Sequence, residues 1–136
     1  MPRRTSEPAY FGPLGERSFG ANRGTDYNAG IAEKAAYCRE ANEQMLVCAL
    51  LEDVAVLDNL DTILAVPGID LYSIGPNDFS QSLGYPGQPD HPEVIKTMQE
   101  IANRIRQAGR RMQGDIMQGA WVSDMLLEAG RRILSP

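Results

Sequence analysis

The sequence predicts an α/β fold in which parallel strands alternate with helices. Two short apolar runs, at 45–51 and 69–74, have the length of buried strands. Each run is followed by a segment in which apolar residues recur at helical spacing, over 54–64 and over 92–108. Strands that alternate with helices pair in parallel through right-handed crossovers. With 136 residues, the chain is expected to form one domain.

The first part of the chain predicts an arm without regular structure. Residues 1–25 are rich in Pro, Gly, Ser and Arg and show no hydrophobic period, which is typical of an ordered loop. Over 27–42 the sequence becomes rich in Ala and favours a helix. We therefore expect an arm over 1–25 and an α/β domain over 26–136.

Turn and cap residues predict where the helices begin and end. A Pro-Gly pair is expected to end the helix over 54–64. After the second strand, several Gly and Pro residues predict a long loop over 75–90. Asp90 is the expected N-cap of the next helix, which has a proline in its first turn. Gly109 is the expected left-handed C-cap of that helix.

A weak internal repeat occurs near the C-terminus. The segments 108–112 and 129–133 both contain Ala-Gly-Arg-Arg followed by an apolar residue. Each predicts the end of a helix, a glycine cap and the start of a strand, which gives strands over 112–117 and at 133–134. Four strands are too few for a closed barrel, which takes about 200 residues at the least. The sequence therefore predicts an incomplete α/β domain.

Two carboxylates stand where two different strands are expected to end. Glu52 closes the first apolar run, and Asp78 lies just after the second. The C-terminal ends of parallel strands form one rim, and ligands bind there in such folds. A magnesium-type cation binds one or two carboxylates and takes its other ligands from water and substrate. Glu52 and Asp78 therefore predict a divalent metal site. The alternative is that Glu52 begins the next helix and Asp78 holds a turn.

The segment that contains Asp78 also predicts an anion site. Residues 75–80, Gly-Pro-Asn-Asp-Phe-Ser, directly follow the second strand. Successive backbone N–H groups in such a turn can surround an anionic group. The alternative is an ordinary tight turn, because a Gly-Pro pair occurs in anion-binding turns and in ordinary turns.

His91 is the only histidine of the chain. It is therefore the only side chain whose ordinary pKa suits proton transfer near neutral pH. However, it stands at the expected start of a helix, after a long loop. A surface role in the first helical turn is favoured over catalysis.

Composition argues against several classes of partner. Thirteen Lys and Arg residues against eighteen Asp and Glu residues give a net charge of −5, whereas binding of nucleic acid needs a basic surface. No apolar run approaches the roughly 20 residues of a membrane span. Cys38 and Cys48 match no metal-binding spacing, and no apolar segment of an export signal follows the basic start of the chain. We expect reduced thiols and a cytoplasmic protein.

Several short motifs occur in a fixed order along the chain: Leu51-Glu52-Asp53, Leu57-Asp58-Asn59-Leu60-Asp61, Val66-Pro67-Gly68-Ile69-Asp70, Ile74-Gly75-Pro76-Asn77-Asp78-Phe79-Ser80-Gln81-Ser82-Leu83-Gly84 and His91-Pro92-Glu93-Val94. In order and spacing they resemble the HpcH/HpaI aldolase family. This family includes 4-hydroxy-2-oxoheptanedioate and 2-dehydro-3-deoxyglucarate aldolases and is related to the β-type citrate lyases. The resemblance extends over nearly the whole chain and corresponds to the C-terminal half of the family's domain.

The resemblance implies part of a (β/α)8 TIM barrel of the phosphoenolpyruvate/pyruvate type, roughly its last four strands. It implies a class II aldolase, a carbon–carbon lyase that acts on 2-oxo acids through a pyruvate enolate and assembles as a homo-oligomer, typically a hexamer. Glu52 and Asp78 match the family's ligands for magnesium, manganese or cobalt. The amides around Gly75, Asn77 and Asp78 match its site for the pyruvate carboxylate. The second substrate would be an aldehyde.

The chain departs from the family at two points. Leu50 stands where the family often has a glutamine that contacts the substrate. The family's histidine base and pyruvate-binding arginine belong to the first half of the barrel and have no counterpart in this sequence. We therefore expect the metal-binding half of an active site without its base. One alternative is a non-catalytic half-barrel that needs a partner to fold or function, and another is an open flavodoxin-like sheet that binds an anion at its rim.

Overall fold

The computed structural model of the chain describes residues 7–21, 23–28, 31, 33–117 and 122–134. Its centre is a parallel sheet of three strands in sequence order: β1 (Cys48–Leu51), β2 (Leu71–Ile74) and β3 (Arg111–Met112). In the register of the sheet, Leu51 pairs with Ile74 and Tyr72 pairs with Met112. The two strands predicted from apolar runs and their parallel pairing are confirmed.

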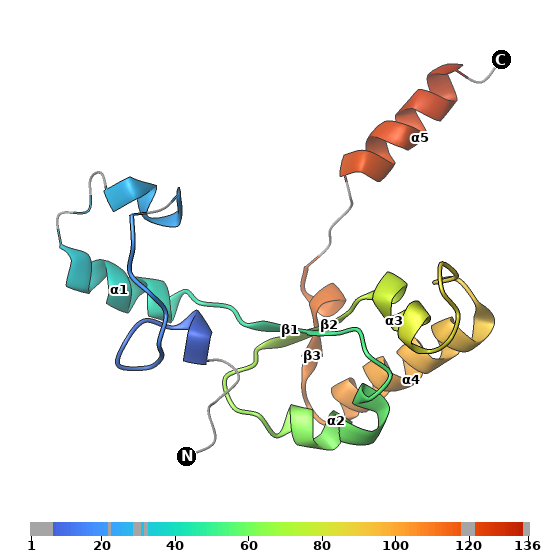
Figure 1. Cartoon of the computed structure of the whole chain (residues 1–136), viewed down its shortest axis with the longest axis horizontal. Coiled ribbons are helices and arrows are strands. Elements are labelled where there is room, and N and C mark those ends of the chain that lie inside the picture. Colours follow the sequence, from blue (N-terminus) through green and yellow to red (C-terminus); the bar gives the residue numbers. More distant parts are fainter. Residues whose placement is uncertain (1–6, 22, 29–30, 32, 118–121, 135–136) are drawn as a thin grey trace.

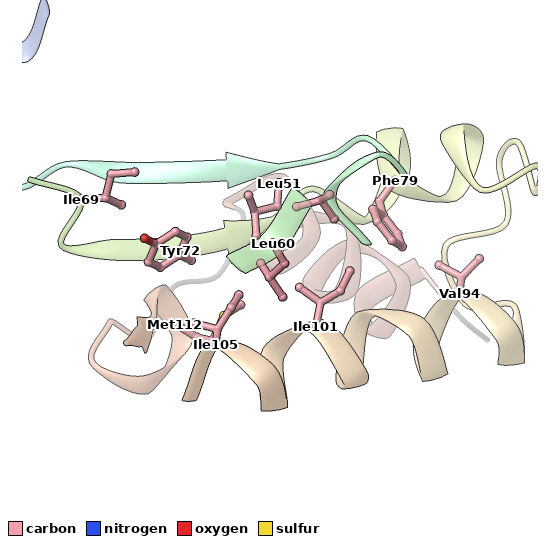
Figure 2. Packing of buried hydrophobic residues seen from close by; sticks show 10 residues of the cluster. Leu51, Leu60, Ile69, Tyr72, Phe79, Val94, Ile101, Ile105 and Met112 are labelled. Carbon is pink, nitrogen blue, oxygen red and sulfur yellow. The ribbon is translucent and has the colours of Figure 1, made fainter. Parts of the chain in front are cut away.

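Helices α2 (Val56–Leu64) and α4 (Pro92–Gln107) cover one face of this sheet, and the short helix α3 (Pro76–Ser82) follows the end of β2 and packs beside α4 (Figure 1). Figure 2 shows Leu60 of α2 and Ile101 and Ile105 of α4 pointing toward the strands. Strand side chains alternate between the two faces, so only every second one joins this core. The buried core consists of Leu51, Val56, Leu60, Ile69, Tyr72, Phe79, Val94, Ile101, Ile105 and Met112.

The described part of the arm packs on helix α1 (Lys34–Glu43), away from the sheet (Figure 1). Phe11 is buried, with the rings of Phe19 and Tyr37 at 5.8 and 6.2 Å between centroids. The Asn42 side chain accepts a bond from the Phe11 N–H at 2.7 Å and donates one to its carbonyl at 3.0 Å. Two short 3₁₀ segments, Glu7–Ala9 and Arg23–Asn28, belong to this region. The expected domain boundary after residue 25 stays a prediction.

The predicted loop over 75–90 is wrong in its first part, which forms the helix α3. Gly75 is the N-cap, and Pro76 stands at the first helical position, where its missing N–H costs no hydrogen bond. Phe79 anchors this short helix in the core. The prediction failed because a Gly-Pro pair starts helices as well as turns.

The next helix, α4, begins one residue later than predicted. His91, and not Asp90, is its N-cap, and the His91 Nδ1 accepts a bond from the Glu93 N–H at 3.3 Å. The predicted end is confirmed, because Gly109 has a φ of 73° after the C-terminal turn.

The C-terminal part differs most from the prediction. Strand β3 has two residues, and the chain then forms the 3₁₀ turn η3 (Gln113–Asp115) instead of a strand over 112–117. Helix α5 (Val122–Leu134) includes the expected cap Gly130 and the expected strand at 133–134. Glycine costs a helix only about 1 kcal/mol relative to alanine, which the surrounding Leu, Ala, Glu and Arg residues offset. The described sheet therefore has three strands instead of four.

Asp115 fastens the turn after β3 to helix α4. Its carboxylate accepts bonds from Nε and Nη2 of Arg106, the shortest at 2.8 Å, and from the Met112 N–H at 3.0 Å. These hydrogen bonds, first of all the one from Arg106, lower the pKa of Asp115 below its ordinary 3.8. A carboxyl group with a lowered folded-state pKa stabilises the fold above its ordinary pKa, and this contribution is lost as the pH falls through the folded-state value.

We therefore expect the variant Asp115→Asn to be less stable than the wild type at pH 7. The difference should begin to shrink below about pH 4, where the carboxyl of the unfolded chain takes up a proton, and should disappear as the pH falls through the lower folded-state pKa. Urea unfolding of both proteins at pH 7 and pH 3 measures this. An equal difference at the two pH values would contradict a role of the Asp115 charge.

No described helix is long and apolar enough to cross a membrane.

Candidate functional site

Strands β1 and β2 end at the same edge of the sheet and bring Glu52 beside Gly75. Leu51 and Ile74, the last residues of β1 and β2, pair with each other. The residues that follow them, Glu52 and Gly75, are therefore neighbours at the edge of the sheet. A Cβ atom added to Gly75 would lie 3.2 Å from Glu52 Oε2 and 3.3 Å from Glu52 Cβ. Glycine is therefore the residue that leaves room for the Glu52 carboxylate at this position.

Asn77 and Asp78 occupy the first turn of α3, directly after Gly75. The first backbone bond of this helix runs from the Phe79 N–H to the Gly75 carbonyl at 2.8 Å. The N–H groups of Asn77 and Asp78 precede that bond, so they have no acceptor within the helix. They are the donors that the sequence predicted for an anion after the second strand.

One cavity of about 710 Å³ contains all four predicted site residues in its wall. Glu52 directly follows β1, and Gly75, Asn77 and Asp78 lie at the start of α3. The other lining residues come from the three strand ends and the turn after β3: Leu50, Tyr72, Ser73, Ile74, Pro76, Met112, Gln113, Gly114 and Met117. The sequence did not predict Gln113 as a site residue, because a strand was expected over 112–117.

The two carboxylates are exposed at this cavity. Within the described part of the chain, neither Glu52 nor Asp78 forms a hydrogen bond or an ion pair through its side chain. The start of α2 is held by the neighbouring Asp53, whose Oδ1 accepts a bond from the Ala55 N–H at 2.8 Å. Both carboxylates are thus available for a ligand.

These residues fit a cation of the magnesium type. Among the described residues, no group of three or more His, Cys, Asp and Glu side chains could hold a metal, so a site enclosed by protein ligands, as zinc requires, is not formed there. A magnesium-type ion binds through one or two carboxylates and keeps positions for water and substrate. Two unpaired carboxylates at an open cavity meet that need.

His91 lies outside the cavity, as its position in the sequence suggested. Its ring stacks on Tyr85 at 3.9 Å between centroids, and its Nδ1 caps α4. The chain therefore presents no imidazole to the two carboxylates.

The model of the HpcH/HpaI aldolase/citrate lyase family matches residues 21–133. The chain belongs to this family. A curated relative, 2-keto-3-deoxy-L-rhamnonate aldolase of Shigella boydii, is 40% identical over 108 residues, which cover 79% of this chain and 40% of the relative. The enzyme of the same name from Klebsiella pneumoniae is 41% identical over 98 residues, or 72% of this chain and 36% of the relative.

Solved structures of family members confirm the partial-barrel fold. A HpcH/HpaI aldolase/citrate lyase family protein from Burkholderia cenocepacia is 25% identical, with a TM-score of 0.72 over 93% of this chain and 56% of that protein. The HpcH/HpaI aldolase from Desulfitobacterium hafniense is 29% identical, with a TM-score of 0.60 over 93% and 48%. The chain spans about half of each solved barrel and about 40% of the curated relatives.

Proposed function

We propose that this chain supplies the cation- and 2-oxo-acid-binding half of a class II aldolase, a carbon–carbon lyase that acts on a 2-oxo acid and an aldehyde. The observation that carries the proposal is the single cavity that holds Glu52, Gly75, Asn77 and Asp78 together, with both carboxylates unpaired. The curated relatives that match this chain are named aldolases, which supports the reaction class.

In this proposal each residue has a distinct task. Glu52 and Asp78 hold a divalent ion such as magnesium, manganese or cobalt, since hard oxygen ligands accept all three. The N–H groups of Asn77 and Asp78 bind the carboxylate of the 2-oxo acid by charge-assisted hydrogen bonds. Gly75 keeps the space beside Glu52 free. When bound, the ion supplies a Lewis acid for the keto oxygen of the substrate.

The proposed lyase needs a base that the cavity wall of this chain does not show. Its histidine is stacked on Tyr85 and caps a helix. We infer that the base comes from a second polypeptide segment that adds to the open edges of the sheet.

The second candidate function is a non-catalytic half-barrel that needs a partner. The observation in its favour is that the chain spans only 40% of its curated relative. The two candidates differ in manganese binding at Glu52 and Asp78, which the first requires and the second does not, and neither supplies a base for cleavage of an aldol substrate by the chain alone. We expect negligible cleavage, and turnover of about 1 per second or more would show a base within this chain. The expected cytoplasmic location stays a prediction.

The proposed cation site is tested by titrating the chain with manganese in a calorimeter, using two matched glycine variants. Gly75→Ala places a methyl group 3.2 Å from Glu52 Oε2 and 3.3 Å from Glu52 Cβ, so the Glu52 side chain must shift by a few tenths of an ångström. Gly114 lines the same cavity, but a Cβ at that position meets nothing within 4 Å. We expect Gly75→Ala to weaken manganese binding by about 10-fold, the size of effect that misplaced ligands produce.

The variant Gly114→Ala should bind manganese like the wild type. Absence of manganese binding by the wild type, or equal binding by both variants, would contradict the proposed site.

A further inference from the structure

The loop that carries Glu52 is hydrogen-bonded to both ends of helix α3. Just before Glu52, the Leu51 carbonyl accepts a bond at 3.1 Å from the N–H of Gly75, the N-cap of α3. After it, the Val54 N–H donates a bond at 2.8 Å to the Oγ of Ser82, the last residue of α3. This second bond is partly buried, so water competes with it less than with an exposed bond. The two bonds lie on either side of Glu52 in the sequence, so they limit how far its backbone can move relative to α3.

Helix α3 also carries the other carboxylate of the cavity. Asp78 lies in its first turn, and Ser82 lies about one helical turn further along. The helix itself is fixed in the core, because Phe79 is fully buried and Leu83, which follows Ser82, packs against the core cluster. The Ser82 hydroxyl is therefore a fixed acceptor, and the same rigid helix holds Asp78 and the loop that carries Glu52.

Ser82 differs in this respect from the other polar groups near the loop. The Asp53 side chain accepts a bond from the Ala55 N–H at 2.8 Å, and this bond stays within the loop before α2. The Ser80 hydroxyl donates to the Asn77 carbonyl at 2.7 Å, inside its own helix α3. Of the two serines of α3, only Ser82 joins the helix to the loop through its side chain.

We propose that Ser82 is a positioning residue of the cation site: its hydroxyl sets the spacing of the Glu52 and Asp78 carboxylates and so makes the site prefer magnesium to calcium. This inference rests on the proposed function, because it presupposes that the two carboxylates bind a cation. Magnesium demands near-ideal octahedral geometry with ligands at about 2.0–2.1 Å, whereas calcium accepts flexible arrangements of oxygen ligands at about 2.3–2.6 Å. A fixed pair of carboxylates suits the first requirement, and a loosened pair still satisfies the second.

Calorimetric titration of the full chain with magnesium and with calcium tests the role of Ser82. Ser82→Ala removes the acceptor of the Val54 N–H and loosens the loop. We expect its magnesium affinity to fall about 10-fold, as happens when an outer-shell partner of a metal ligand is lost. Its calcium affinity should fall less than about 3-fold, because calcium tolerates a changed ligand spacing. Partial unfolding would lower both affinities by the same factor, so the ratio of the two affinities separates positioning from loss of structure.

Two variants serve as controls. Ser82→Thr keeps a hydroxyl at the same position and should keep the magnesium-to-calcium ratio of the wild type. Thr97→Val removes a hydroxyl that donates to the Glu93 carbonyl at 2.7 Å within α4. Thr97 does not line the cavity, so both affinities should stay unchanged in this variant.

Failure of the cation site and failure of the Ser82 role give different results. If the wild type binds neither cation, the proposed cation site and this inference are both wrong. If the wild type binds magnesium but Ser82→Ala keeps the wild-type ratio of affinities, only the role of Ser82 is overturned. A wild type that binds calcium more tightly than magnesium would overturn it too. So would a Ser82→Thr variant that behaves like Ser82→Ala, since the hydroxyl would then not be the group that positions the loop.

Discussion

Replacing Glu52 or Asp78 by alanine is expected to abolish manganese binding and to leave the fold intact. Each substitution removes one of the two carboxylates at the cavity, and the remaining ligands would be water and a single carboxylate. Loss of an outer-shell partner of a metal ligand costs about 10–100-fold in affinity, so loss of a ligand itself should cost at least about 100-fold. Calorimetric titration of the two variants with manganese measures this loss.

The unfolding midpoint of both variants should equal that of the wild type, because neither side chain bonds to another described residue. Asp58→Ala is the matched control. Asp58 is an exposed carboxylate in the first turn of α2 and does not line the cavity. It should bind manganese as the wild type does. Undiminished binding by Glu52→Ala and Asp78→Ala would place the ion elsewhere.

Replacing Phe79 by alanine is expected to cost about 3–5 kcal/mol of unfolding free energy, the usual range for a buried phenylalanine. Phe79 is fully buried and joins the short helix α3 to the core, near Val94 of α4 (Figure 2). Small domains have only about 5–15 kcal/mol of stability in total. The variant should therefore be largely unfolded in low concentrations of urea, and circular dichroism follows the transition.

The conservative variant Phe79→Leu is the control for that loss. It keeps most of the buried volume, so it should cost less than about 1.5 kcal/mol. Because α3 also carries Asn77 and Asp78, a wild-type midpoint for Phe79→Ala would show that α3 holds its place without the core. In that case burial of Phe79 would not be what positions the site.

Sequence patterns were most informative where one local signal dominated. The apolar runs at 45–51 and 69–74 contain the parallel strands β1 and β2, because strands of an α/β sheet are rich in apolar side chains. Burial was predicted less well, since Cys48 and Leu50 of β1 are exposed. Gly109 was predictable since a left-handed C-cap favours glycine. Alternation of strands and helices also predicted that Glu52 and the segment after the second strand share one rim.

Sequence patterns predicted the wrong secondary structure where the same residue type occurs in two kinds of structure. The Ala-Gly-Arg-Arg repeat is identical at 108–111 and 129–132, but Gly109 ends a helix whereas Gly130 lies inside one. The two copies of the repeat differ in the tertiary contacts of the residues that follow the glycine. Arg110, which follows Gly109, donates bonds to the Val66 carbonyl and the Tyr72 hydroxyl and so joins the start of β3 to the sheet.

The α/β class, the positions of two strands and the identity of the rim carboxylates could all be read from the amino-acid order, because spacing and local propensity specify these features. The space that Gly75 leaves for Glu52 could not, since it depends on the register of two strands separated by a helix. The helical form of α3 and the inclusion of Gly130 in helix α5 likewise emerged only in three dimensions. These outcomes depend on packing between segments far apart in the chain, which no local pattern contains.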